Sequence, residues 1–210
     1  MATWRYVDFS VKEAQRLADL TSIVVDLETT EIICNLFTKR AQQFEQSKDR
    51  ETLVLMEALC TAAIVRYGRS FVSGVRQQIP VQVIDQLSKK HQESHVFFMD
   101  LRHKWVAHSV NAFECTDVVA YLTPEEKGPK NVSGISARPM RTVSLGIPDM
   151  LRLQKLAAAV RGKLNILIKD EEQKVLCFAQ SLPPDQFYAK DTPTPKLAED
   201  KDAGKSRRKW

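Results

Sequence analysis

The first half of the chain has a helical apolar pattern that ends in DLRHKWVAHS, residues 100–109. All four histidines of the protein lie between His91 and His108, within this one segment. Histidine is the side chain best suited to proton transfer near neutral pH. Arg102, six positions before His108, adds a permanent cation whose donor fork suits phosphate. If the chain carries out chemistry, these residues are its first candidates.

A long helix is expected before this stretch, from about residue 10 to 45. Its apolar residues recur at spacings of three, four and seven, as on one face of a helix. Ser10 and Glu13 form a capping-box pattern that predicts its start. Thr29 and Thr30 are adjacent β-branched residues, so the pattern fits either one continuous helix or two helices in line.

Two further helices are expected to follow. Asp49 is a plausible N-cap for the second, whose apolar stripe runs to about residue 75. Pro80 suits the first turn of the third, which should cover about residues 81–107 and so carry the arginine–histidine stretch. The pattern therefore predicts a mainly helical protein with its chemically suggestive residues late on the third helix.

A small β-hairpin is expected before the last helix. Residues 117–122 and 135–145 alternate and are rich in β-branched side chains, which is typical of strands, and a loop with two prolines joins them. We expect a hairpin insertion over about residues 117–145. Pro148 then fits the first turn of the last long helix, which Pro183-Pro184 ends.

The chain is predicted to form one helical domain over residues 1–182 and a disordered basic tail over residues 183–210, which is rich in Pro, Lys and Asp. Its 210 residues, 43% hydrophobic and 27% charged, are ordinary for a soluble globular protein. No apolar run reaches the roughly 20 residues of a membrane span, and the N-terminus lacks the layout of a secretory signal. We expect a cytoplasmic protein with no membrane partner.

Several enzyme classes and metal sites lack their motifs. The sequence contains no GxxxxGK[ST] phosphate loop, no HExxH and no GxSxG, and its four cysteines form no CxxC pair. Buried free thiols are the expected state of most of the cysteines. His91 and His95 are four residues apart on one helix face, as in some metal sites, yet no third ligand is close in sequence. We expect no metal and no cofactor.

Residues 102–109, RHKWVAHS, resemble the R-x4-6-H motif of the HEPN superfamily, whose all-helical members occur in toxin–antitoxin and abortive-infection systems. The turn at residues 67–71, YGRSF, is also similar to such chains, as is the order of long helices with the motif late on one of them. The resemblance covers about residues 10–180 without the hairpin. It implies an all-α, HEPN-like bundle of long antiparallel helices.

The resemblance also implies a function. Many members are metal-independent endoribonucleases that dimerise so that two motifs line one cleft, and a cognate antitoxin can neutralise them. On that pattern His108 is the general base or acid, Arg102 binds the scissile phosphate, and His103 supports the pair. Histidine stands after the arginine here, where asparagine is common in the family. A homodimer, RNA and an antitoxin are the expected partners.

Further RNA contacts are expected from three cations, Lys104, Arg69 and Arg66. A solvated helix face is the simpler account of the two arginines, as it is of Arg76 nearby. The catalytic interpretation has rivals: a non-catalytic helical interaction module, or an RNA- or nucleotide-binding module.

Arg102 could instead form a surface ion pair with Asp100 or Glu114, while His108 caps a helix end. Residues six apart on a straight helix are rotated by about 240°, so Arg102 and His108 share a site only if the helix ends or bends near Ala107 or a second protomer completes it.

Overall fold

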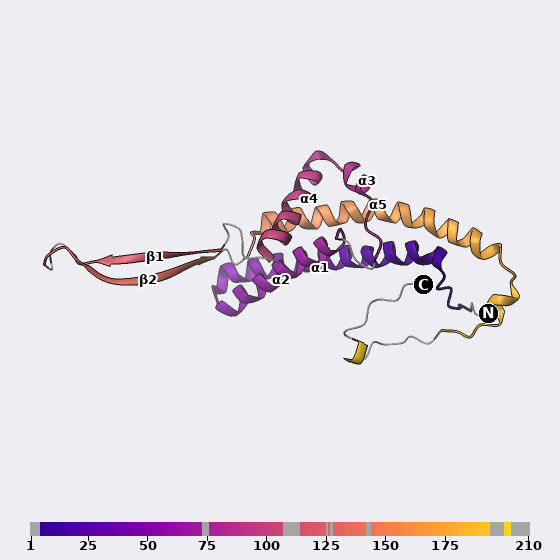
Figure 1. Ribbon diagram of the computed structural model, residues 1–210, viewed down its shortest axis with the longest axis horizontal. Coiled ribbons are helices and arrows are strands. Elements are labelled where there is room, and N and C mark those ends of the chain that lie inside the picture. Colours follow the sequence, from indigo (N-terminus) through magenta and orange to yellow (C-terminus); the bar gives the residue numbers. More distant parts are fainter. Residues whose placement is uncertain are drawn as a thin grey trace.

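The computed structural model describes residues 5–72, 76–106, 114–124, 126, 128–141, 144–193 and 200–202 of the 210-residue chain. Within this part the chain is mainly helical, with one two-stranded antiparallel sheet. The two longest helices run side by side in opposite directions along the longest axis of the molecule, and the hairpin projects from one end (Figure 1). The expected mainly helical character and the hairpin insertion are confirmed.

The first long helix is α1, Gln15–Ser47, which follows a 3-10 turn at Lys12–Ala14. It is continuous: the hydroxyls of Thr29 and Thr30 donate to the carbonyl groups of Val25 and Asp26, at 2.8 and 2.9 Å, so the β-branched pair is accommodated without a break. The predicted capping box is wrong, because the Ser10 hydroxyl donates to the Asp8 carboxylate instead.

A two-residue connection joins α1 to α2, Arg50–Arg69. Lys48 takes the left-handed conformation, φ 53°, and ends α1. Asp49 caps α2 as predicted: its carboxylate accepts a hydrogen bond from the Thr52 N–H at 2.7 Å. Such a short connection makes α1 and α2 antiparallel neighbours.

The predicted helix over residues 81–107 is interrupted. It forms α3, Val81–Asp85, and α4, Lys89–Leu101, and continues as a π-helical turn at Arg102–Val106. The break has a local cause, because the Ser88 hydroxyl accepts from the His91 N–H at 3.4 Å as the N-cap of α4. The Gln92 amide donates to two carbonyl groups left free at the end of α3, at 2.9 and 3.0 Å.

The hairpin consists of β1, Glu114–Leu122, and β2, Val132–Arg141. β1 begins three residues earlier than predicted, and β2 both begins and ends earlier than the predicted strand over residues 135–145. Val118 pairs with Ala137, and the register shifts near Tyr121 and Leu122. No side chain described in the hairpin is buried. The helical body therefore does not depend on the hairpin for its core.

The core is centred on α1, which packs against α2 on one side and against α5, Ile147–Gln180, on another. The expected proline is in the first turn of α5, after the N-cap Gly146. The largest fully buried side chains come from four helices: Leu20, Ile23, Leu27, Phe37, Ile64, Tyr67, Phe98, Met150, Leu153, Leu156, Val160 and Leu164. No helix in the described part is apolar over a length that would cross a membrane.

The segment after residue 183, expected as a disordered tail, begins with a short helix, α6, Asp185–Tyr188. Phe187 lies against Phe9, with ring centroids 5.3 Å apart, and the Arg5 guanidinium donates to the carbonyl group of Lys190. The start of this segment therefore packs on the N-terminal arm. Residues 194–199 and 203–210 lie outside the described residues.

Removal of the hairpin should leave the helical body intact. We expect that replacing residues 114–141 by a short Gly/Ser linker changes the free energy of unfolding by less than about 1 kcal/mol, because no described hairpin side chain is buried. Phe37→Ala, at a fully buried position, should cost about 3–5 kcal/mol. Urea unfolding followed by circular dichroism tests both, and a hairpin deletion as costly as Phe37→Ala would contradict this assignment.

Candidate functional site

Arg102 begins the π-helical turn, and its aliphatic stem lies directly on Gly68 of α2. A Cβ atom at position 68 would lie only 2.8 Å from Cγ of Arg102 and 3.3 Å from its Cβ. Glycine is therefore required for this approach of the two segments. The Arg102 guanidinium Nη1 lies 3.1 Å from Nδ1 of His103. The structure thus brings two of the predicted site residues together and holds one of them by its stem.

The other residues of the predicted motif do not join the contact between Arg102 and His103 in the described part of the chain. Lys104 is exposed and pairs with Asp100 at 3.1 Å, so Asp100 is used by Lys104 rather than by Arg102. More than half of each of these two side chains is exposed, and such surface pairs contribute little. Trp105 is buried and anchors the turn in the core. His108 lies outside the described residues, so its position relative to Arg102 is untested.

A buried polar contact lies next to the Arg102 contact. The hydroxyl of Tyr67 and Nδ1 of His95 are joined by a hydrogen bond of 2.8 Å, and Phe71 contacts the same imidazole edge-on at 4.5 Å between ring centroids. Burial lowers the pKa of His95 and raises the pKa of Tyr67, because it disfavours the charged form of each. His95 is therefore a neutral packing and hydrogen-bonding group at neutral pH.

Tyr67 and Gly68 are consecutive on α2, and their contacts, His95 and Arg102, are seven residues apart on α4 and the turn that follows it. Seven residues bring a helix back to nearly the same face, so one stripe of α4 meets the end of α2. The metal alternative for His91 and His95 gains no support, because the described residues contain no group of three metal-binding side chains.

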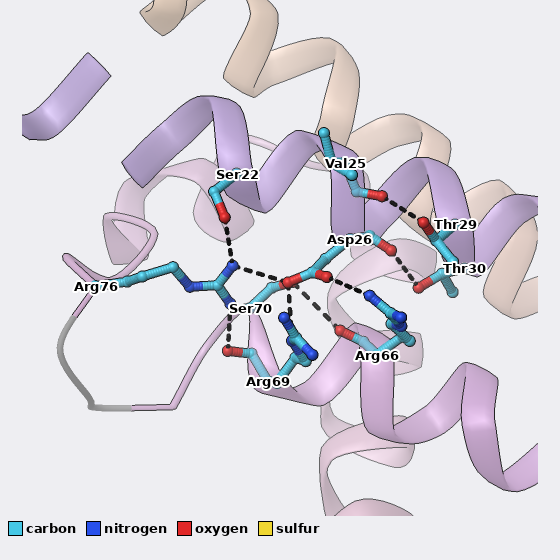
Figure 2. Close-up of polar contacts among 9 residues, drawn as sticks. All are labelled: Ser22, Val25, Asp26, Thr29, Thr30, Arg66, Arg69, Ser70 and Arg76. Atoms are coloured by element: carbon cyan, nitrogen blue, oxygen red, sulfur yellow. Dashed lines mark hydrogen bonds and ion pairs between the residues drawn. The ribbon is translucent and has the colours of Figure 1, made fainter. Parts of the chain in front are cut away.

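The two arginines predicted to bind RNA from α2 lie on another face of that helix. Nη1 of Arg66 and Nε of Arg69 are each 2.9 Å from the carboxylate of Asp26, and Nη1 of Arg76 is 2.8 Å from it. Figure 2 shows the three guanidinium groups meeting at this one carboxylate of α1. Their binding of RNA stays a prediction.

The role of Asp26 was not predicted from the sequence. One signal was present: Asp19 and Asp26 are seven residues apart, each directly before a leucine of the apolar stripe of α1, and both are buried. A carboxylate on the buried face of a helix requires hydrogen-bond donors from neighbouring residues. The sequence does not reveal which donors, because the three arginines follow Asp26 by 40 to 50 residues.

Comparison of the chain with protein-family models, with curated proteins and with solved structures finds no match.

Substitution of Gly68 by alanine should destabilise the protein although it removes a helical glycine. Overpacking against Arg102 costs about 1–3 kcal/mol, more than the roughly 1 kcal/mol gained in helix propensity. In an Arg102→Ala background the clashing Cγ is absent, so the same change should become neutral or stabilising. Urea unfolding of the four proteins measures the coupling.

Gly162→Ala is the matched control for this cycle, since nothing lies within 4 Å of a Cβ placed at that helical position. It should raise the free energy of unfolding by about 0.5–1 kcal/mol. If Gly68→Ala were as stabilising as Gly162→Ala, the close contact between α2 and Arg102 would be wrong.

The burial of His95 predicts a pH dependence of stability. The unfolded chain takes up a proton on this residue near its ordinary pKa of about 6.5, whereas the folded chain takes it up only at lower pH. The His95 contribution to stability is therefore complete above about pH 6.5 and is lost as the pH falls below it. His95→Asn should reduce the difference between free energies of unfolding at pH 7.5 and pH 5.5.

The control for this measurement is His103→Asn, because His103 is exposed. A larger loss of the pH-dependent difference in His95→Asn than in His103→Asn assigns that difference to His95. An unchanged pH dependence in folded His95→Asn would show that His95 is not the group responsible.

Proposed function

We propose that the protein is a HEPN-like, metal-independent endoribonuclease that acts as a homodimer in a toxin–antitoxin or phage-defence role. The observation that carries this proposal is the fixed position of Arg102: its stem lies on Gly68, and its guanidinium lies beside His103 on a partly exposed turn. The antiparallel long helices, with Arg102 directly after the end of α4, support the family resemblance.

In the proposed reaction the ribose 2′-hydroxyl attacks the adjacent phosphate while the bond to the 5′-oxygen breaks. His108 accepts the hydroxyl proton or donates a proton to the leaving oxygen, and the two protomers of a dimer supply one histidine for each task. Arg102 binds the phosphate and stabilises the negative charge that develops in the transition state. Because the nucleophile is the 2′-hydroxyl, only RNA is a substrate.

Arg102 suits this task because among the described residues no carboxylate pairs with it. A guanidinium that no carboxylate neutralises keeps its charge for an anion, and a stem packed on α2 loses little freedom on binding. His103 has the supporting role that the resemblance implies. Lys104 adds an exposed cation whose weak pair with Asp100 can be exchanged for a phosphate.

The second candidate is a non-catalytic RNA- or nucleotide-binding module, and the observation that favours it is the set of half-exposed arginines on α2, Arg66 and Arg69. Such a module uses arginine charge and needs no titrating histidine. The catalytic proposal, in contrast, requires His108. This difference separates the two candidates by experiment.

The test is cleavage of structured and unstructured RNA by the purified protein in excess chelator. Wild type should cleave, and His108→Ala and Arg102→Ala should each lose about 100-fold or more in rate, the usual share of a general acid–base group or a transition-state donor. Arg161→Gln is the matched control, because this arginine of α5 is held by Glu31 at 2.7 Å, and it should cleave as wild type does.

Circular dichroism confirms that each variant is folded. Retained cleavage by folded His108→Ala would refute the assigned mechanism. RNA binding without cleavage in all proteins, lost in Arg102→Ala, would favour the second candidate.

A further inference from the structure

We propose that Arg66, Arg69 and Arg76, assembled on the buried carboxylate of Asp26, form a binding site for a phosphate-type oxyanion. This site is distinct from the Arg102–His103 pair, lies on another face of α2, and does not rest on the proposed ribonuclease activity.

The first observation is an excess of positive charge. Three guanidinium groups lie within 2.9 Å of one carboxylate, and arginine stays protonated in proteins. The other carboxylate on this face of α1 is Asp19, which accepts a hydrogen bond from the N–H of Gln77 at 3.0 Å. Even with both aspartates counted, the cluster keeps one positive charge in excess. A bound anion would neutralise it.

The second observation concerns hydrogen-bond donors. Arg66 uses only Nη1 and Arg69 uses only Nε in contacts with described residues. Within the described part of the chain, the other N–H groups of these two guanidinium groups remain available to a ligand. Arg76 is different, since its Nη1 donates to Ser22 and Asp26 and its Nη2 donates to the carbonyl group of Arg69. Arg66 and Arg69 are therefore the binding forks, and Arg76 is the clamp that holds the cluster together (Figure 2).

The third observation is the layered burial of the cluster. The side chains of Arg66 and Arg69 are 40% and 48% exposed, whereas those of Arg76 and Asp26 are 16% and 3% exposed. The two forks thus reach solvent above a buried anchor. A fork tethered by one of its own donors loses less freedom on binding than a free surface arginine. Asp26 therefore organises the site although its charge opposes that of the ligand.

The ligand class follows from the spacing of the forks. Arg66 and Arg69 are three residues apart on α2, so their stems are neighbours about 5–6 Å apart. Two forks at this separation can bind two oxygens of one phosphate group, for which arginine has the matching geometry. A backbone phosphate of RNA and a free phosphate or nucleotide phosphate share this chemistry, and the experiment distinguishes them.

The experiment is titration calorimetry of the full chain with inorganic phosphate at constant ionic strength. Wild type should bind, Arg69→Gln should bind about tenfold more weakly, and Arg66→Gln should behave like Arg69→Gln. Arg161→Gln, which removes an equal charge from an arginine paired with Glu31, should bind as wild type does. Equal phosphate affinity of Arg69→Gln and Arg161→Gln, or no binding to wild type, would overturn the proposal.

Asp26→Asn separates an organised site from simple accumulation of charge. Removal of the negative charge would tighten phosphate binding if charge alone mattered, but the proposal predicts weaker binding because the forks lose their anchor. Tighter binding in folded Asp26→Asn would overturn the role given to Asp26. If this variant does not fold, the two arginine variants, each changed at a half-exposed position, still test the site.

A labelled single-stranded RNA identifies the source of the phosphate. If phosphate displaces the RNA and Arg69→Gln weakens both, the site binds the RNA backbone. If Arg69→Gln weakens phosphate binding and leaves RNA affinity unchanged, the ligand is a free phosphate or nucleotide. Both results support the site. If wild type binds phosphate but does not cleave RNA, the result counts against the proposed ribonuclease activity and not against the phosphate site.

Discussion

The burial of α1 between two other helices is the constraint on which the rest of the structure depends. Its buried apolar side chains are covered by α2 on one side and by α5 on another, so every polar group on the covered faces needs a partner. Thr30 uses the carbonyl group of Asp26 on its own helix. Asp26 uses arginines from α2 and from the chain that follows it. Burial of α1 thus requires specific polar contacts from distant residues.

Those contacts extend the constraint to the candidate site. Two arginines bound to Asp26 fix the rotation of α2 about its axis, and this rotation turns Tyr67 and Gly68 toward α4. Gly68 in turn sets how closely Arg102 approaches. The position of the Arg102 guanidinium is therefore coupled, through one helix, to a carboxylate on the opposite side of α2. Each link in this series is a described contact, and none of them is local in sequence.

Most of what the sequence predicted correctly is local, although the capping box at Ser10 and Glu13, also local, was wrong. Helical periodicity, the Asp49 cap and the proline at the start of α5 depend on residues within a few positions of one another, and the hairpin joins two strands that are consecutive in the chain. The break at Ser88 was missed because the apolar stripe continues on both sides, while the serine cap and the Gln92 amide together satisfy the broken turn. The Asp26 cluster could not be predicted, because its partners meet only when the helices pack. The Arg102–His103 contact could be predicted from the sequence because the two residues are adjacent.

The positive charges of arginines in the described part are matched to different degrees. Arg161 lies beside two glutamates, Glu31 at 2.7 Å and Glu28 at 3.7 Å, so its charge is fully matched within the fold. Arg102 lies beside a histidine, and the cluster on Asp26 has more guanidinium groups than carboxylates. Both of these unmatched regions involve the last turn of α2, through Gly68 and through Arg69. Unmatched arginine charge held in place by packing favours anions, so both proposed sites place their ligand at this end of α2.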